Sequence, residues 1–261
     1  MLHGNPSWSF YFRKLVLALR DRYRCIVPDH IGMGLSGKPG ENQYSFTLDS
    51  RVDDLDSLLV QLGIHKDMTL VLHDWGGMIG MAYASRYPDR IKRIVILNTA
   101  AFHLPVGKEV PWQLKLSRLP VLGAILNQGL NAFCRGAVMQ CVTRKPMSKE
   151  VSHAYLAPYD CWHNRLAIRK FVEDIPLTES EPAYETVNNV DKGLDAFSGL
   201  PMLICWGMKD FVFDHYFLDE WTRRFPKAEV HRFEDAGHYV LEDAADDIVP
   251  LVKQFLKGHP L

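Results

Sequence analysis

Three residues of the chain have the types and the order of a catalytic triad. Asp74 ends the apolar run LVLHD and is followed by a tryptophan and two glycines. Asp210 follows a second apolar run in WGMKD, and His238 lies in the sequence DAGHY. A strand, a nucleophile, a glycine and a helix form the sharp turn that exposes a nucleophile above a sheet, and the acid and the histidine follow in that order. Each residue alone is as well explained by a helix cap or a turn, but the three together favour a triad.

A carboxylate at the nucleophile position suits attack on carbon. It is charged at neutral pH and needs no base to activate it, and the N-terminus of the following helix favours a negative charge. Attack of Asp74 on an sp³ carbon would give an alkyl-enzyme ester. His238, oriented by Asp210, could then activate water against that ester. No acid follows the strand ending in LNTA at residues 97–100, so Asp210 is the expected partner of the histidine.

Two further residues could hold a departing anion. The segment HGNPSW at residues 3–8 precedes the first recognisable helix, where an oxyanion loop is expected. The alternative for this segment is a plain Gly-Asn-Pro turn. The amide of Asn5 and the indole N–H of Trp75 are hydrogen-bond donors that could point into one pocket. Core packing is the alternative for Trp75.

Strand-like and helix-like segments alternate around these residues. Helices are expected at 47–62, at 78–87 and at about 239–257, and strands at 24–29, 68–73, 91–98, 201–207 and 228–233. This alternation predicts an α/β protein with a mostly parallel sheet and helices on both faces.

A helical insertion separates the third and fourth expected strands, which are those at 91–98 and 201–207. Residues 102–185 carry helical segments at 111–134, 148–157 and 162–173, broken by prolines. An insertion at the carboxyl ends of parallel strands covers the usual ligand crevice. We therefore expect a core of residues 1–101 and 186–261 and a cap of residues 102–185.

Composition excludes several classes of function. Thirty basic and 31 acidic residues leave a net charge of −1, which disfavours a nucleic-acid partner. No stretch reaches the roughly 18 apolar residues of a transmembrane helix. The five cysteines lack CxxC spacing, which favours free thiols in a reducing compartment, so we expect a cytoplasmic protein. The histidines are mostly solitary, and neither a metal nor a cofactor is expected.

Five motifs together resemble the α/β-hydrolase superfamily: HGNP, DHIGMGLS, HDWGG, WGMKD and DAGHY. More narrowly, they resemble the haloalkane dehalogenase group. In that group the nucleophile is an aspartate, an asparagine follows the HG pair, and a tryptophan follows the nucleophile. Asn5 and Trp75 match those two positions.

One branch of this group is similar to the chain along nearly its whole length. RYRCIVPDHIGMGLS, SRVDDLDSLL, RIVILNTAAF and AYLAPYDCWHNR…FVEDIPL resemble the OleB branch, the β-lactone decarboxylases of bacterial long-chain olefin biosynthesis. Residues 154–177 are the most specific part, because dehalogenases tend to have a Pro-Arg-Glu-Ile-Pro-like sequence where this chain has Glu-Asp-Ile-Pro at 173–176.

The resemblance implies a substrate and a reaction. A cis-3-alkyl-4-alkyloxetan-2-one, which is a β-lactone with two alkyl chains, would give a cis-alkene and CO2 through Asp74, with attack at either the ring carbon or the carbonyl carbon. It also implies a hydrophobic small-molecule substrate and an assembly with other olefin-biosynthesis enzymes. Aromatic and apolar residues of the insertion could line an alkyl channel or belong to the core: Trp112, Leu116, Phe133, Tyr155, Trp162 and Phe171.

Three other functions stay open. A haloalkane dehalogenase would use the same five residues. An epoxide hydrolase would also use an aspartate nucleophile, with a pair of lid tyrosines for which Tyr155, Tyr159 and Tyr184 are available. A protein that only binds an apolar ligand is the last alternative.

The N-terminus departs from the family pattern. Family members carry a few dozen residues before the HG motif, and these form the first strands of the sheet, whereas this chain begins MLHG. Met1 and Leu2 would then be the stub of a central strand between 24–29 and 68–73, whose loss would leave backbone groups unpaired. The expectation is an N-terminally shortened sequence or a misassigned start.

Overall fold

Four parallel strands in the order β1-β2-β3-β4 form the sheet of the computed structural model, which describes residues 1–261. The strands are β1 (Met68–Asp74), β2 (Ile91–Thr99), β3 (Met202–Gly207) and β4 (Glu229–Phe233). β3 is a continuous run of apolar residues and β2 contains one at 94–97, because helices cover the sheet on both sides. Four of the five strands predicted from the sequence are therefore confirmed.

Residues 24–29 do not form a strand, and that prediction is wrong. In space, only Met1 and Leu2 lie between this segment and β1. The N–H of Leu2 donates to the carbonyl of Val71 at 2.8 Å, and the N-terminal ammonium of Met1 donates to the carbonyl of Ile26 at 2.8 Å. A strand needs a neighbour that offers successive N–H and C=O groups, and two residues cannot supply such a ladder.

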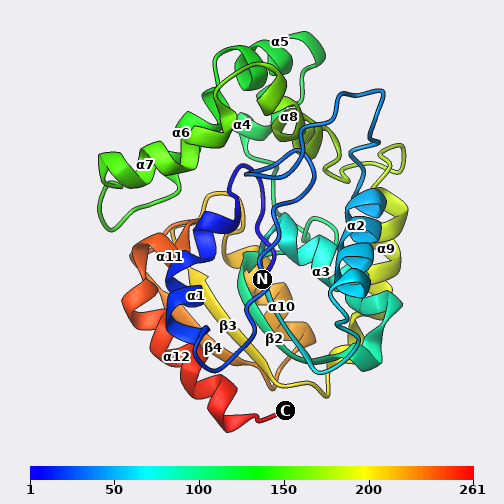
Figure 1. The fold of residues 1–261 in the computed structure, drawn as a ribbon, viewed down its shortest axis with the longest axis vertical. Coiled ribbons are helices and arrows are strands. Elements are labelled where there is room, and N and C mark those ends of the chain that lie inside the picture. Colours follow the sequence, from blue (N-terminus) through cyan, green and yellow to red (C-terminus); the bar gives the residue numbers. More distant parts are fainter.

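Alternate residues of each strand face two separate apolar clusters, as the pleat of a strand requires. Leu70, Leu72, Ile94 and Ile96 face the larger cluster, whereas Val71, Val95 and Leu97 face the smaller one. The larger cluster is covered by α2 (Leu48–Gln61), α3 (Trp75–Arg86), α9 (Tyr184–Gly193) and α10 (His215–Arg224). The smaller one is covered by α1 (Arg13–Leu19), α11 (Val240–Asp243) and α12 (Ala245–Gly258). The sheet thus lies between two helical layers (Figure 1).

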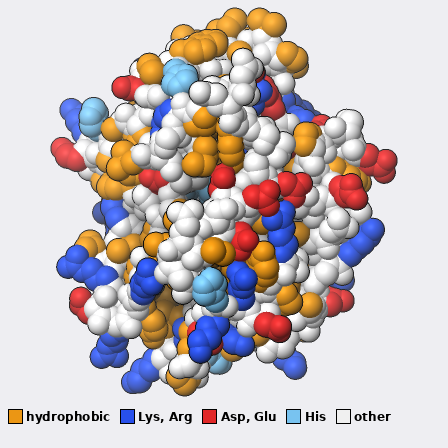
Figure 2. Space-filling view, turned by 45° about the vertical axis from the view of Figure 1, so that its right-hand side comes forward, with side chains coloured by type: hydrophobic (Ala, Val, Ile, Leu, Met, Phe, Trp, Pro, Cys, Tyr) orange, Lys and Arg blue, Asp and Glu red, His pale blue; other side chains and the backbone are white.

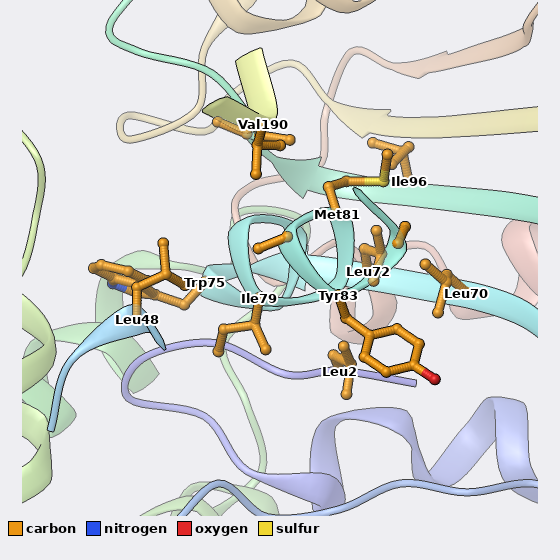
Figure 3. Packing of buried hydrophobic residues seen from close by; sticks show 14 of the residues in the cluster. Leu2, Leu48, Leu70, Leu72, Trp75, Ile79, Met81, Tyr83, Ile96 and Val190 are labelled. Atoms are coloured by element: carbon orange, nitrogen blue, oxygen red, sulfur yellow. The ribbon is translucent and has the colours of Figure 1, made fainter. Parts of the chain in front are cut away.

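Helix α3 occupies the centre of the larger cluster. Met81 is directed toward Ile96 of β2, and Trp75, the first residue of α3, lies beside Leu48, the first residue of α2 (Figure 3). The helix starts three residues earlier than the sequence predicts, because the chain turns into it directly after β1. The predicted helix at 239–257 is divided into α11 and α12, since Ala244 leaves the helical region at φ −124°.

Short helices from residues 102–185 lie above the carboxyl ends of the strands (Figure 1). They are α4 (Trp112–Ser117), α5 (Pro120–Ala124), α6 (Ala132–Gln140), α7 (Lys149–Leu156) and α8 (Leu166–Glu173). The segment predicted as helical at 111–134 is divided by Pro120 and by a π-helical turn, Ile125–Gly129. Exposed apolar side chains gather at the top of the molecule in Figure 2, and those of α4, α5 and their neighbours are Trp112, Leu119, Val121, Leu122 and Ile125.

None of the helices combines the length and the apolar character that crossing a membrane would require.

Candidate active site

The turn at Asp74 directs its side chain into the cavity above the end of β1. Asp74 has φ 51° and ψ −127°, an unusual backbone conformation for a residue other than glycine. Gly76 and Gly77 follow because side chains there would collide with the carbonyl of Leu2 and the hydroxyl of Thr99. The carboxylate does not cap α3. The helix-cap explanation of Asp74 therefore does not apply, and the side chain is free to face the cavity.

The structure brings the three residues of the predicted triad together. Nδ1 of His238 lies 2.7 Å from Oδ2 of Asp210, and its Nε2 lies 3.7 Å from Oδ2 of Asp74. All three side chains are buried. The histidine is thus anchored through one nitrogen and presents the other toward the nucleophile, which is the arrangement that orients an imidazole for proton transfer.

Asp210 is held by a residue that the sequence analysis missed. Its Oδ1 accepts hydrogen bonds from the N–H groups of Val212 at 2.7 Å and Phe213 at 3.1 Å. Its Oδ2 accepts one from Nδ2 of Asn98 at 3.0 Å. Asn98 lies near the end of β2, in the sequence LNTA. From the sequence we note only that no acidic residue follows this segment. The side-chain amide of Asn98 thus supports Asp210, which follows β3, by donating a hydrogen bond to it.

His73 fixes the loop that carries His238. Its Nε2 lies 3.0 Å from the carbonyl oxygen of His238, so a neutral ring must hold its proton on Nε2 to donate. Burial, and then the nearby His238, hold the pKa of His73 well below its usual range, which keeps the ring neutral. The ring also stacks on Tyr11 at 4.1 Å. The position of His73 next to the nucleophile was the only sequence signal for this role.

Asn5 contacts the nucleophile with its backbone and the cap with its side chain. Its N–H donates to Oδ1 of Asp74 at 2.6 Å. Its Nδ2 donates to the carbonyl of Ile168 in α8 at 3.1 Å. That bond uses one of the two amide hydrogens. The second hydrogen stays available to a ligand, because Asn5 lines the cavity.

The indole of Trp75 is also available to a ligand. Trp8, Trp206 and Trp221 donate their indole N–H groups to backbone carbonyls. No hydrogen bond of the structure uses that of Trp75, although its ring is buried and lines the cavity. The ring packs edge to face on Phe171, with centroids 5.3 Å apart. Asn5 and Trp75 therefore offer one donor each beside Asp74.

A largely apolar cavity of about 330 Å³ lies between the sheet and the cap helices. Twenty of its 32 lining residues are hydrophobic, and its polar wall includes Asn5, Asp74 and His238. Of the channel residues considered from the sequence, Trp112, Leu116 and Phe133 line this cavity. The other three do not: Tyr155 is bonded to Glu242, Trp162 is half exposed, and Phe171 is buried beneath Arg51.

Electrostatics couple Asp74 to His238. Burial raises the pKa of Asp74 above its usual range, although the nearby His238 and the N–H groups of Trp75 and Asn5 oppose the rise. Burial thus opposes the ionised form of Asp74 that the helix N-terminus was expected to favour. Burial would lower the pKa of His238, but the charge and hydrogen bond of Asp210, with the charge of Asp74, raise it overall. No cluster of His, Cys, Asp or Glu is arranged to hold a metal ion.

The comparisons agree with this fold. The family model described as "alpha/beta hydrolase fold" matches residues 1–121 and 148–245, and the chain belongs to that family. It is 53% identical to the cis-3-alkyl-4-alkyloxetan-2-one decarboxylase of Shewanella oneidensis, over 98% of this chain and 80% of the relative. It is 48% identical to the protein of the same name from Xanthomonas campestris pv. campestris, over 100% of this chain and 88% of the relative.

More distant similarity leads to dehalogenases. The chain is 29% identical to haloalkane dehalogenase 2 of Mycobacterium tuberculosis, over 97% of this chain and 85% of the relative. The crystal structure of haloalkane dehalogenase DbeA from Bradyrhizobium elkani superposes with a TM-score of 0.85 at 26% identity, covering 98% of this chain and 88% of that one. The resemblance identified from the motifs is thus confirmed, and the OleB-like branch is the nearer of the two.

Proposed function

We propose that this protein is a cis-3-alkyl-4-alkyloxetan-2-one decarboxylase that uses Asp74 as its nucleophile. The observation that carries the proposal is a carboxylate, held 3.7 Å from a histidine, in the wall of a cavity lined mainly by hydrophobic residues. A β-lactone with two alkyl chains needs both an apolar cavity and a nucleophile for carbon. The 53% and 48% identical relatives carry the name of this activity.

Attack at the ring carbon gives a balanced reaction. A carboxylate oxygen of Asp74 forms a bond to the carbon that carries the ring oxygen, and that C–O bond breaks to release a carboxylate. The bond between this carboxylate and the neighbouring carbon then breaks, and its electron pair forms the C=C bond as the Asp74 oxygen leaves. The products are an alkene and CO2, Asp74 is regenerated, and no water is consumed.

Asn5 and Trp75 would act on the charge that develops during this attack. The ring oxygen becomes part of a carboxylate, and preorganised donors stabilise such charge more strongly in a dry site than in water. The free amide hydrogen of Asn5 and the indole N–H of Trp75 lie beside Asp74 for this purpose. His238, anchored by Asp210, would balance the charge of Asp74 as it is consumed and regenerated.

The second candidate, haloalkane dehalogenase, is favoured by the 29% identical relative and by the same five residues. That reaction ends differently, because the alkyl-enzyme ester must be hydrolysed by a water that His238 activates. Epoxide hydrolysis is disfavoured, because none of Tyr155, Tyr159 and Tyr184 lines the cavity. Tyr155 and Tyr159 are in addition hydrogen-bonded to Glu242 and to the carbonyl of Ser7.

The deciding experiment offers the protein both substrates. A synthetic cis-3-alkyl-4-alkyloxetan-2-one should give a cis-alkene, detected by gas chromatography, and the Asp74→Asn variant should give none. Release of halide from 1-bromoalkanes should be slower than alkene formation. Steady halide release without any alkene would replace the decarboxylase by the dehalogenase.

We further propose the division of the chain and its setting. Residues 102–185 form the cap, and residues 1–101 and 186–261 form the core that carries the triad. The exposed apolar side chains of the cap support an assembly with the enzyme that supplies the lactone. The five free cysteines support a reducing compartment such as the cytoplasm. Co-purification with the lactone-forming enzyme from the native cell tests the assembly.

A further inference from the structure

Helix α8 contacts both residues that would hold the leaving anion. The carbonyl of Ile168 accepts the side-chain hydrogen bond of Asn5 at 3.1 Å. One turn later, Phe171 packs edge to face on the indole of Trp75 at 5.3 Å. Ile168 and Phe171 are themselves fully buried. Helix α8 thus contacts Asn5 through Ile168 and Trp75 through Phe171.

A buried ion pair joins the end of α8 to the core. Nη1 of Arg51, on α2, lies 2.9 Å from Oδ2 of Asp174, which directly follows α8. The guanidinium lies 3.7 Å from the centre of the Phe171 ring and 5.7 Å from that of Trp75. Arg51, Phe171 and Trp75 thus form one contiguous cluster, and Asp174 pairs with its guanidinium.

The ion pair is not explained by stability. Nε and Nη2 of Arg51 and Oδ1 of Asp174 are buried without a hydrogen-bond partner. A buried charge pair with unsatisfied groups is generally no more stable than apolar residues of the same size. Burial also raises the pKa of Asp174 to about 6, against the attraction of Arg51. A positioning role accounts for the retention of such a pair better than a structural one.

We propose that Arg51 and Asp174 are positioning residues for Trp75, the leaving-anion donor that packs on Phe171. The pair holds α8 and its Phe171 ring against the core, and Phe171 in turn fixes the indole N–H of Trp75 beside Asp74. Neither residue lines the cavity, so both act through Trp75 rather than on the substrate. This inference rests on the proposed function for the nature of the anion, which is the carboxylate released from the lactone.

A double-mutant cycle tests the inference with the cis-β-lactone as substrate. Arg51→Met should lower kcat about tenfold, a fraction of the effect of losing an anion donor outright. It should change KM less than about threefold, because the cavity wall is intact. In a Trp75→Phe background the same substitution should lower kcat less than about twofold, because the donor that Arg51 positions is already gone. An equal loss of kcat in both backgrounds would show a general structural effect and overturn the inference.

Asp174→Asn provides a second arm in case Arg51→Met does not fold, and it should show the same dependence on Trp75. Arg93→Met is the matched control. Arg93 is another buried arginine, bonded to the carbonyl of Leu256 and the hydroxyl of Thr69. Thr69 lies five residues before Asp74 on β1, or about 16 Å away. The control variant should melt at a lower temperature and keep kcat within about twofold.

Bromide binding separates this inference from the proposed reaction. Quenching of tryptophan fluorescence by bromide, corrected with the Trp75→Phe protein, should report anion binding at Trp75 without any turnover. Arg51→Met should weaken that binding about tenfold even if the lactone proves not to be the substrate. Unchanged bromide affinity together with unchanged kcat would contradict the positioning role, whereas failure of the wild-type protein to form alkene would contradict only the proposed function.

Discussion

Asn98 and His238 bind the same oxygen of Asp210. Nδ2 of Asn98 lies 3.0 Å from Oδ2 of Asp210, and Nδ1 of His238 lies 2.7 Å from it. Oδ1 of Asn98 meanwhile accepts a hydrogen bond from the N–H of Gly207 at 2.8 Å. The amide therefore ties the acid of the triad to the end of β3 and determines which lone pair remains for the histidine.

Asn98→Leu should destabilise the protein and slow it. The substitution leaves the N–H of Gly207 and an oxygen of Asp210 with one partner fewer in a buried site, which costs about 1–3 kcal/mol for each unsatisfied group. We expect a fall of about 3 kcal/mol in the free energy of unfolding, measured with urea, and a loss of kcat of about tenfold. Asn164→Leu removes an exposed Asn–Asp hydrogen bond and serves as the control. An Asn98→Leu protein with wild-type kcat would show that Asp210 needs no support.

His238→Phe should separate the two candidate reactions. With a 1-bromoalkane, Asp74 can still be alkylated but no group activates water, so the ester should persist. Mass spectrometry should find the enzyme heavier by one alkyl group on the peptide that contains Asp74. With the lactone, the ring-carbon route consumes no water, and some alkene should still form. Complete loss of alkene formation, with a stable acyl adduct, would favour attack at the carbonyl carbon.

Asp174 should make the folded state less stable as the pH rises from about 4 to 6. Its pKa is raised from 3.8 to about 6, so the folded state binds the proton more tightly than the unfolded state does. The contribution of Asp174 to the free energy of unfolding is complete below its pKa in the unfolded state. It is lost as the pH rises through its pKa in the folded state. The full difference corresponds to about 3 kcal/mol.

Comparison with Asp174→Asn isolates this contribution. The free energy of unfolding of the wild-type protein, minus that of the variant, should fall between pH 4 and pH 6 and then level off. Urea titrations at a series of pH values provide the measurement. A constant difference across this range would mean that Asp174 has an ordinary pKa and that Arg51 compensates its burial fully.

Leu116→Trp should shorten the alkyl chains that the enzyme accepts. Leu116 lines the cavity, and the larger indole would occupy part of its volume of about 330 Å³. We expect kcat/KM for long-chain lactones to fall at least tenfold more than for short-chain ones, because long alkyl chains would collide with the larger side chain. Leu122→Trp is the control, because Leu122 belongs to α5 of the same cap but is absent from the cavity wall. Equal losses for all chain lengths would place the alkyl groups elsewhere.

The sequence could predict those candidate site residues that belong to short local motifs. The triad follows from three strand ends, and Asn5 and Trp75 follow from their neighbours in the chain. Asn98, His73 and the Arg51–Asp174 pair carry no such motif, because their partners lie at least 109 residues away in the chain. The strand expected at 24–29 failed for the same reason, since its apolar pattern cannot reveal whether a neighbouring strand is present to pair with it.

The order of the strands has a consequence for how the enzyme can be assayed. Asp74 ends β1, Asn98 lies in β2, Asp210 follows β3 and His238 follows β4, and β1 to β4 are also neighbours in the sheet. Each strand therefore contributes one residue to a row that runs across the whole sheet. A slip of any strand by one residue turns its side chains to the opposite face. Turnover thus requires the correct register of all four strands. The specific activity of a preparation therefore measures the fraction of the protein that is correctly folded.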